Sequence, residues 1–237
     1  MSANPQHSSD SVEHYTPASV VEAARATLGG FDLDPFSCDE ANQTVRARSY
    51  FDGVDSVVGT TRFPRRGNGW IRPWHGRVFI NPPGGLVDSA GRRVEKNCRD
   101  TGSCGLPPGH KHHGTRAAQK RAWFKLAEEY KRRRVKSAIF VCFSLELLQS
   151  TQTDRGAVGP VLGTDGQPLP IPLDFPICYP AKRLEYLAPG GRVGEQPTHA
   201  SCVILLPPRD NVSEFYGVFA SFSCHFGPIG RVVFPES

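Results

Sequence analysis

The chain has 237 residues, enough for one domain with a sizeable core; 38% of them are hydrophobic and the formal net charge is +5. No apolar run approaches the ~20 residues that a membrane-spanning helix requires, so the sequence argues against a membrane-embedded protein. The seven cysteines are an odd number, which favours a reduced cytoplasmic compartment over a disulfide framework.

The predicted elements begin after a polar N-terminus. Residues 1–13 contain no apolar stretch and are predicted to be disordered, which leaves 14–237 as a single domain. Apolar residues then recur at helical spacing through "HYTPASVVEAARATLGG", where Thr16 suits the cap, Pro17 the first helical position and Gly29 the stop. "GFDLDPF" is predicted to form a short strand, and "DEANQTVRARSYF" a second helix.

The rest of the chain alternates between strand and helix patterns. A strand over 77–80 leads into Asn81, and residues 84–115, rich in glycine and charge without a period, are interpreted as an insertion. A helix is predicted from Arg116, followed by "VKSAIFVCFS", a continuous apolar run typical of a strand buried on both faces. Residues 156–197 are predicted to be mostly loop, with "KRLEYL" a possible edge strand, whereas "ASCVILLPP" is another predicted buried strand and "GRVVFP" closes the chain.

Helices that alternate with apolar strands predict an α/β sheet with helices on both faces. In such sheets ligands bind at the carboxyl ends of the strands. Three strand ends carry polar groups or prolines and are therefore expected to converge: Asp34-Pro35, Asn81-Pro82-Pro83 and Ser144.

Positive charge is concentrated in one segment. Residues 92–136 contain fourteen Lys or Arg against four Asp or Glu, a local net charge of +10, so the rest of the chain sums to −5. A solvated helix face explains part of this run, and the lysine and arginines at 131–134 also suit a helix C-terminus. A concentrated basic segment on an otherwise acidic chain favours a nucleic-acid partner.

The Asn81-Pro82-Pro83 sequence at a predicted strand end suits transfer of a methyl group to an exocyclic amine. The nitrogen lone pair of such an amine is conjugated with the aromatic ring, and two acceptors aimed at its N–H bonds free it for attack. The amide oxygen of Asn81 and the carbonyl of Pro82 supply these acceptors, and successive prolines make the turn rigid. A plain strand-ending turn remains the alternative when the motif is taken alone.

"HYTP", "DLDPFSCDEAN" and "VFINPP" occur in an order and spacing that resemble the phage-type (Dam-like) DNA N6-adenine methyltransferases of phages and prophages. The likeness spans about residues 14–210 and includes "FSLELLQ", "DFPICYPAKRLEYL" and "THASCVILLPP". The resemblance implies a Rossmann-like, S-adenosylmethionine-dependent sheet with a basic Cys/His-containing insertion. It also implies a double-stranded DNA substrate and a bacterial host cytoplasm.

The resemblance assigns site residues by position. Asn81, Pro82 and Pro83 match the catalytic motif. The cofactor, S-adenosyl-L-methionine, would be bound by Tyr15, Thr16, Pro17, Asp34, Pro35 and Phe36. Asp34 would accept from the methionine ammonium. One of Asp39, Glu40 and Asn42 is a further candidate, because the usual glycine-rich turn is absent, although acidic residues also suit the first turn of a helix.

Two features concern the DNA. Gly84 occupies the place where the wider class has an aromatic residue that stacks on the extruded base, and Phe143, Trp70, Trp74 and Phe79 are candidates to replace it. For Phe79 and Phe143, core packing is the stronger interpretation. The insertion is expected to contact DNA phosphates and to hold a target-recognition element, through Arg92, Arg93, Arg99, Lys111 and Arg116.

The insertion also contains a Cys/Cys/His/His set. Cys98, Cys104, His110 and either His112 or His113 lie within sixteen residues, and structural zinc would hold together a loop poor in apolar residues. Their spacing is looser than that of common zinc sites, so no metal ligand is assigned. A flexible loop, or histidines that face phosphate, are the alternatives.

We therefore expect a site-specific DNA adenine-N6 methyltransferase. The alternatives are methylation of another amine (cytosine N4, RNA or a protein amide), a non-catalytic DNA-binding protein that retains the fold, and a structural zinc module on an unrelated core. No pattern specifies the recognised DNA sequence, a restriction partner or the oligomeric state.

Overall fold

The structure is a computed structural model that describes most of the chain. The described residues are 15–52, 68–87, 93–94, 107, 109–110, 116–153, 159–188, 190, 192–193 and 200–235. The predicted disorder of residues 1–13 lies outside them. No helix among the described residues is long and apolar enough to cross a membrane.

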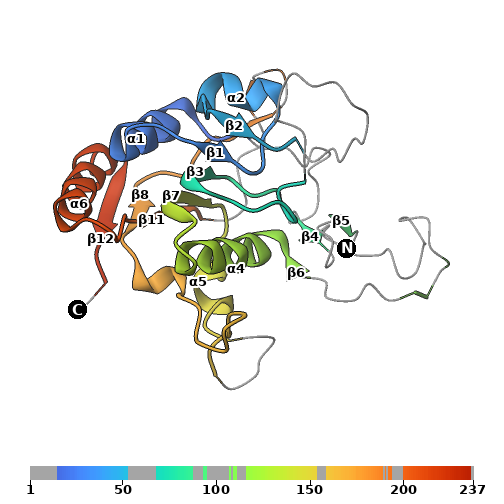
Figure 1. Ribbon diagram of the computed structural model, residues 1–237. Coiled ribbons are helices and arrows are strands. Elements are labelled where there is room, and N and C mark those ends of the chain that lie inside the picture. The colour runs from blue at the N-terminus through green and yellow to red at the C-terminus, as the bar shows by residue number, and fades with distance from the viewer. Residues whose placement is uncertain are drawn as a thin grey trace.

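A seven-stranded mixed sheet forms the centre of the fold (Figure 1). Its order is β12-β8-β11-β7-β3-β1-β2. The strands β2, β1, β3 and β7 run parallel, whereas β11 is antiparallel to β7 and β8, and β12 is antiparallel to β8. The strands are β1 Leu33–Asp34, β2 Ser49–Tyr50, β3 Gly76–Ile80, β7 Val135–Cys142, β8 Ile177–Pro180, β11 Cys202–Leu206 and β12 Gly230–Val233.

Helices pack on both faces of this sheet. Along β7, Phe140 packs with α4 residues on one face, while Ile139 and Val141 pack with α1 and α6 residues on the other. Figure 1 shows α1, α2 and α6 on one side and α4 with α5 on the opposite side. The predicted α/β sheet with helices is thus confirmed. The helices are α1 Ala18–Leu28, α2 Asp39–Val45, α4 Ala118–Lys131, α5 Glu146–Ser150, α6 Val212–Phe226 and a 3-10 turn at Pro172–Asp174.

Two small antiparallel sheets flank the main one. The strands β4 (Leu86–Val87), β5 (Arg93–Val94) and β6 (Arg116–Ala117) pair in the order β5-β4-β6. The strands β9 (Leu187–Ala188) and β10 (Arg192–Val193) form the other sheet. Because β6 pairs with β4, α4 begins at residue 118 and not at Arg116 as predicted.

Three local predictions differ, in whole or in part, from the structure. The second helix, predicted over 39–51, ends at Val45, because Arg46 turns into the left-handed region (φ 52°) and the Asn42 amide binds the backbone of Ala47. The chain then extends into β2 beside β1. Among its described residues the stretch 156–197 is mostly loop, as predicted, but it also contributes β8 to the sheet between β11 and β12.

The third concerns the start of α1. Thr16 was predicted to cap this helix, but Pro17 occupies the cap position and no side chain caps the helix. The predicted stop at Gly29 is confirmed: this residue has φ 69°, in the left-handed region that favours glycine, and its N–H reaches the carbonyl of Arg25.

Candidate active site

The sheet topology has a switch point between β1 and β3. These strands are parallel neighbours, with Leu33 opposite Val78. From β1 the chain passes through α2 to β2 on one side, and from β3 it passes through α4 to β7 on the other. Connections that leave two adjacent strands in opposite directions open a crevice at their carboxyl ends, which is where doubly wound sheets bind ligands.

The predicted strand ends meet at this carboxyl edge. Asp34 is the last residue of β1, Asn81 follows β3 directly, and Ser144 lies two residues beyond β7. Because β1, β3 and β7 are adjacent and parallel, these residues share one edge of the sheet, as predicted from their positions.

Asp34 is a buried carboxyl group. Its residue is 2% exposed, and Oδ1 accepts the N–H of Phe36 at 3.1 Å. Burial raises the pKa of Asp34 to about 7, although the bonds from Phe36 and the Ser37 hydroxyl act in the opposite direction. A cation placed beside this carboxyl would favour its ionised form. The group is therefore poised to bind an ammonium.

Aromatic residues pack around the turn after β1. The ring of Phe36 lies 4.4 Å from that of Trp70 and 5.5 Å from that of Trp74, measured between centroids. Gly69 passes so close that an added Cβ would lie 1.9 Å from the carbonyl oxygen of Pro35. Only glycine allows this approach, so the loop is packed directly on the end of β1.

The segment Tyr15 to Pro17 borders the same turn. Tyr15 exchanges backbone hydrogen bonds with Leu187, and its hydroxyl lies 3.4 Å from Cys38 Sγ and 3.3 Å from Glu40 Oε2. Thr16 is buried, and its Oγ1 has no hydrogen-bond partner among the residues that the structure describes. A buried hydroxyl without a partner costs free energy, so a polar ligand group that reached it would remove this cost.

The three candidates in α2 already have internal partners. Asp39 accepts from the Tyr50 hydroxyl, and Glu40 accepts the Gly190 N–H at 2.6 Å. The Asn42 side chain closes the C-terminus of α2, so its role is structural.

Sequence reasoning missed Asp52, because a helix was predicted to run up to Phe51. Asp52 lies two residues beyond β2, at the carboxyl edge, and is partly exposed. The signal available was its place eighteen residues after Asp34: in related sheets, an acidic residue about 20 residues after the first strand binds ribose hydroxyls.

The catalytic candidates form a tethered turn. Asn81 is partly exposed and Pro82 is buried. Gly85 has φ 83°, which favours glycine, and its carbonyl accepts the N–H of Ala118 at the start of α4 (2.9 Å). The turn is therefore held from both ends, by β3 before it and by α4 after it.

Two predicted base contacts are corrected. Trp74 and Phe79 are both 0% exposed: Trp74 donates its ring N–H to the Gly69 carbonyl, and Phe79 packs on Phe31. Neither offers a ring face to a ligand. Core packing, the stronger interpretation for Phe79, is confirmed.

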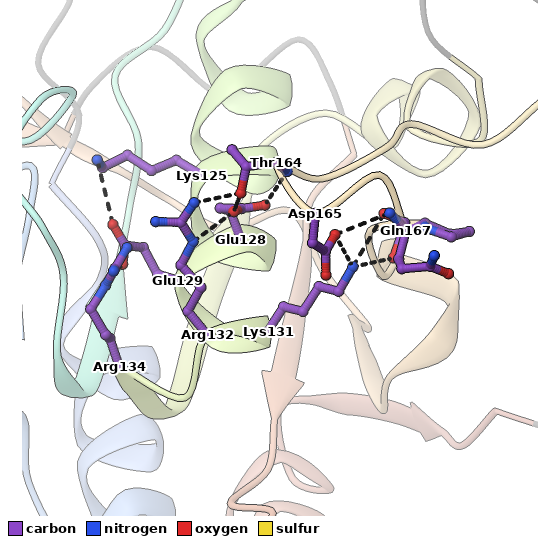
Figure 2. A network of polar contacts seen from close by, with 10 residues as sticks. Lys125, Glu128, Glu129, Lys131, Arg132, Arg134, Thr164, Asp165 and Gln167 are labelled. Carbon is purple, nitrogen blue, oxygen red and sulfur yellow. Dashed lines mark hydrogen bonds and ion pairs between the residues drawn. The ribbon is translucent and has the colours of Figure 1, made fainter.

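The cations at 131–134 lie at the opposite edge of the sheet and have acidic partners. The Arg134 carbonyl accepts the N–H of Gly76, which begins β3, so this helix end lies at the amino ends of the strands. Figure 2 shows Lys131 reaching Asp165 (2.7 Å) and neighbouring cations bound to α4 carboxylates. The pairs are Lys131–Asp165, Arg132–Glu128, Arg133–Asp210 and Arg134–Glu129.

Five residues were predicted to contact DNA, and the structure describes two of them, for which it gives the backbone position alone. Arg93 in β5 and Arg116 in β6 both lie opposite Val87 of β4. Arg92, Arg99 and Lys111 lie outside the described residues. The small sheet that holds Arg93 and Arg116 follows directly after the Asn-Pro-Pro turn, since β4 begins at Leu86.

The predicted zinc ligands are mostly outside the described part of the chain. His110 is described, and its Nδ1 lies 2.7 Å from the carbonyl oxygen of Pro107. Cys98, Cys104, His112 and His113 are not described. Within the described ranges, no group of three or more His, Cys, Asp or Glu side chains is arranged to bind a metal.

A cavity of about 540 Å³ lies away from this edge. Its lining combines Tyr130 at the end of α4 with Pro207 and with Phe219 of α6, and it includes none of the predicted site residues. Its apolar, proline-rich lining offers little for catalysis. The arrangement at the carboxyl edge, with its acid and rigid amide turn, is the stronger candidate for chemistry.

Comparison with known proteins identifies no relative: no family model, no curated protein and no solved structure matches this chain.

Proposed function

We propose that the protein is a DNA methyltransferase that transfers the methyl group of S-adenosyl-L-methionine to N6 of adenine in double-stranded DNA. One observation carries the proposal. The buried acid that ends β1 and the Asn-Pro-Pro turn that follows β3 lie at the carboxyl ends of adjacent parallel strands, at the point where the sheet connections diverge. The proposed cofactor-binding group and the proposed amine-binding group thus share one edge of the sheet, as a direct transfer requires.

The residues at this edge fit the cofactor. Asp34 offers a buried carboxyl to an ammonium, and Thr16 offers a buried hydroxyl that has no partner. Tyr15 and Pro17 hold Thr16 in place, and Pro35 with Phe36 forms the adjacent apolar wall. Asp52, at the end of the next strand, is placed to accept ribose hydroxyls. When bound, S-adenosylmethionine supplies an electrophilic methyl group on its sulfonium.

The Asn-Pro-Pro turn then acts on the amine. The Asn81 amide oxygen and the Pro82 carbonyl accept the two N–H bonds of adenine N6, which localises its lone pair. N6 forms the new bond to the methyl carbon as the carbon–sulfur bond breaks, its electron pair remains on sulfur, and N6 releases one proton. No covalent enzyme intermediate is needed, so preorganised acceptors are the main contribution of the protein.

The location of the insertion suits a DNA substrate. An exocyclic amine inside a duplex is reached only when its base is extruded, and the phosphates must then be held. Arg93 and Arg116 lie in the small sheet that continues from the catalytic turn, next to the proposed site. With the cations at 131–134 paired at the opposite edge, we assign the phosphate contacts to the insertion, including Arg92, Arg99 and Lys111.

Two measurements test the function. The melting temperature of the protein should rise with S-adenosylmethionine concentration, because a ligand that binds only the native state stabilises it. Incubation of unmethylated genomic DNA with the labelled cofactor, followed by nucleoside analysis, should give N6-methyl-2′-deoxyadenosine. Label in cytosine N4, in RNA or in protein would replace the substrate assignment. Cofactor binding without any methyl transfer would refute the proposed enzymatic activity.

A further inference from the structure

The catalytic turn lacks an aromatic residue of its own. Gly84, directly after Asn81-Pro82-Pro83, has no positive φ, so its backbone would accept any side chain. The glycine is therefore not required by the turn, in contrast to Gly85. What the glycine provides is space in front of the turn.

The ring of Phe143 borders this space. A Cβ added at Gly84 would lie 3.8 Å from Phe143 Cζ, the far end of the ring, at ordinary van der Waals distance. Phe143 follows β7, the neighbour of β3, and is partly buried. The ring rests against the core cluster on the α1 side of the sheet and keeps some exposure. A ring that is supported by the core and keeps part of its surface exposed is suited to stacking.

The start of α4 holds both parts of this arrangement. The N–H of Ala118 donates to the Gly85 carbonyl (2.9 Å), and the buried Gln119 accepts the N–H of Phe143 at its Oε1 (3.2 Å). Two consecutive residues thus link the catalytic turn to the backbone of Phe143. Their link sets the distance between Gly84 and the ring.

The other aromatic candidates are placed differently. Trp74 and Phe79 are completely buried. Trp70 packs on Phe36, next to the end of β1, where the cofactor is proposed to bind. Of these aromatic residues, Phe143 is the one in contact distance of position 84.

We infer that Phe143 is the platform on which the extruded adenine stacks, in place of an aromatic residue at position 84. The inference rests on the proposed function. It assigns the recognition of the base to the end of β7, whereas Asn81 and Pro82 bind its amine. The stacking energy of a base on an aromatic residue corresponds to a change of about 5- to 150-fold in kcat/KM.

This assignment is tested by moving the aromatic ring from position 143 to position 84. The variants are Phe143→Ala, Phe143→Leu, and Phe143→Ala combined with either Gly84→Phe or Gly84→Leu. Methyl transfer to unmethylated genomic DNA gives kcat/KM for DNA, and titration with S-adenosylmethionine gives cofactor affinity and checks folding. We expect both single variants to lose about 5- to 150-fold in kcat/KM with unchanged cofactor affinity. Phe143→Leu retains an apolar side chain in case alanine disturbs the core.

The double variants separate stacking from packing. Recovery with Gly84→Phe, and little recovery with Gly84→Leu, would support the platform, because leucine fills space without a ring face. Equal recovery by both, no recovery by either, or unchanged activity in Phe143→Leu would overturn it. A wild-type protein that binds cofactor and transfers no methyl group would instead refute the proposed function.

Discussion

The two edges of the sheet use polar residues in opposite ways. At the amino edge, each cation at 131–134 binds a carboxylate, and the Glu128 carboxylate also accepts hydrogen bonds from Thr164 (Figure 2). At the carboxyl edge, Thr16 is buried without a partner among the described residues, and Asp34 is buried with bonds from the Phe36 N–H and the Ser37 hydroxyl and not from a cation of the described part of the chain. Buried polar groups that are not fully satisfied cost stability, and this contrast between the edges is the reason why we propose the ligand site at the carboxyl edge.

The largest expected effect comes from the catalytic turn. Asn81→Ala removes one of the two acceptors for the amine and should lower kcat by about 100-fold or more, the size expected for loss of a preorganised catalytic hydrogen bond. Labelled methyl transfer measures it. Cofactor affinity should remain close to that of the wild type. As the matched control at the amino edge, Arg132→Ala should leave transfer unchanged. Full turnover in Asn81→Ala would contradict the site.

The next effect tests the buried acid. Asp34→Asn keeps an acceptor for the Phe36 N–H but removes the negative charge opposite the proposed ammonium. A charge-assisted hydrogen bond contributes about 1.5–3 kcal/mol, so the dissociation constant for S-adenosylmethionine should rise about 10- to 150-fold. Calorimetric titration checks it. An unchanged affinity, in a variant with normal thermal unfolding, would rule out Asp34 as the ammonium ligand.

The acidic residues at the two edges should also change the stability of the protein with pH in opposite directions. Burial raises the pKa of Asp34 to about 7, whereas the unfolded chain releases this proton near pH 4. Between these two pH values the native state holds a proton that the unfolded state has released. The free energy of unfolding should therefore fall as pH rises from about 4 to 7, by at most about 1.4 kcal/mol per pH unit. For Glu128, burial raises the pKa but hydrogen bonds from Thr164 and Arg132 lower it overall. Its contribution is therefore present above the ordinary pKa near 4.5 and is lost as pH falls further.

Cofactor binding should reveal the Asp34 proton directly. Because an ammonium favours the ionised carboxyl, affinity for S-adenosylmethionine should rise by up to tenfold per pH unit from about pH 5 to 7 and then level off. Asp34→Asn should flatten this profile. A flat profile in the wild type would show that the carboxyl does not change its charge on binding.

The smallest effect separates the two groups of arginines. Arg116→Ala, in β6 directly after the insertion, should weaken DNA binding a few-fold at low salt and reduce the salt slope by about 0.9. Arg133→Ala removes an exposed pair with Asp210, so we expect about 0–1 kcal/mol in stability and no change in DNA affinity. Filter binding over a range of salt compares them. If both variants lost DNA affinity equally, residues at the end of α4 would have to be assigned phosphate contacts as well.

Local patterns predicted most of the elements but not all of them. The helix α6 was not predicted, because its aromatic and β-branched residues and Gly217 have low helix propensity. The available signal was Asn211, whose side chain caps the helix by accepting from Glu214 N–H. The strand β8 follows Pro176, ends at Pro180 and resembles loop in sequence; pairing with β11 and β12 imposes its extended form.

The sequence by itself determined the α/β alternation and the positions of Asp34 and Asn81 at strand ends, because apolar periodicity and chain breaks act over a few residues. Only the tertiary structure decided three matters: that Thr16 has no partner, that the cations at 131–134 are paired at the far edge, and that Phe143 faces Gly84. Each depends on contacts between segments distant in the chain. Burial and distance arise when those segments pack, and no local pattern encodes them.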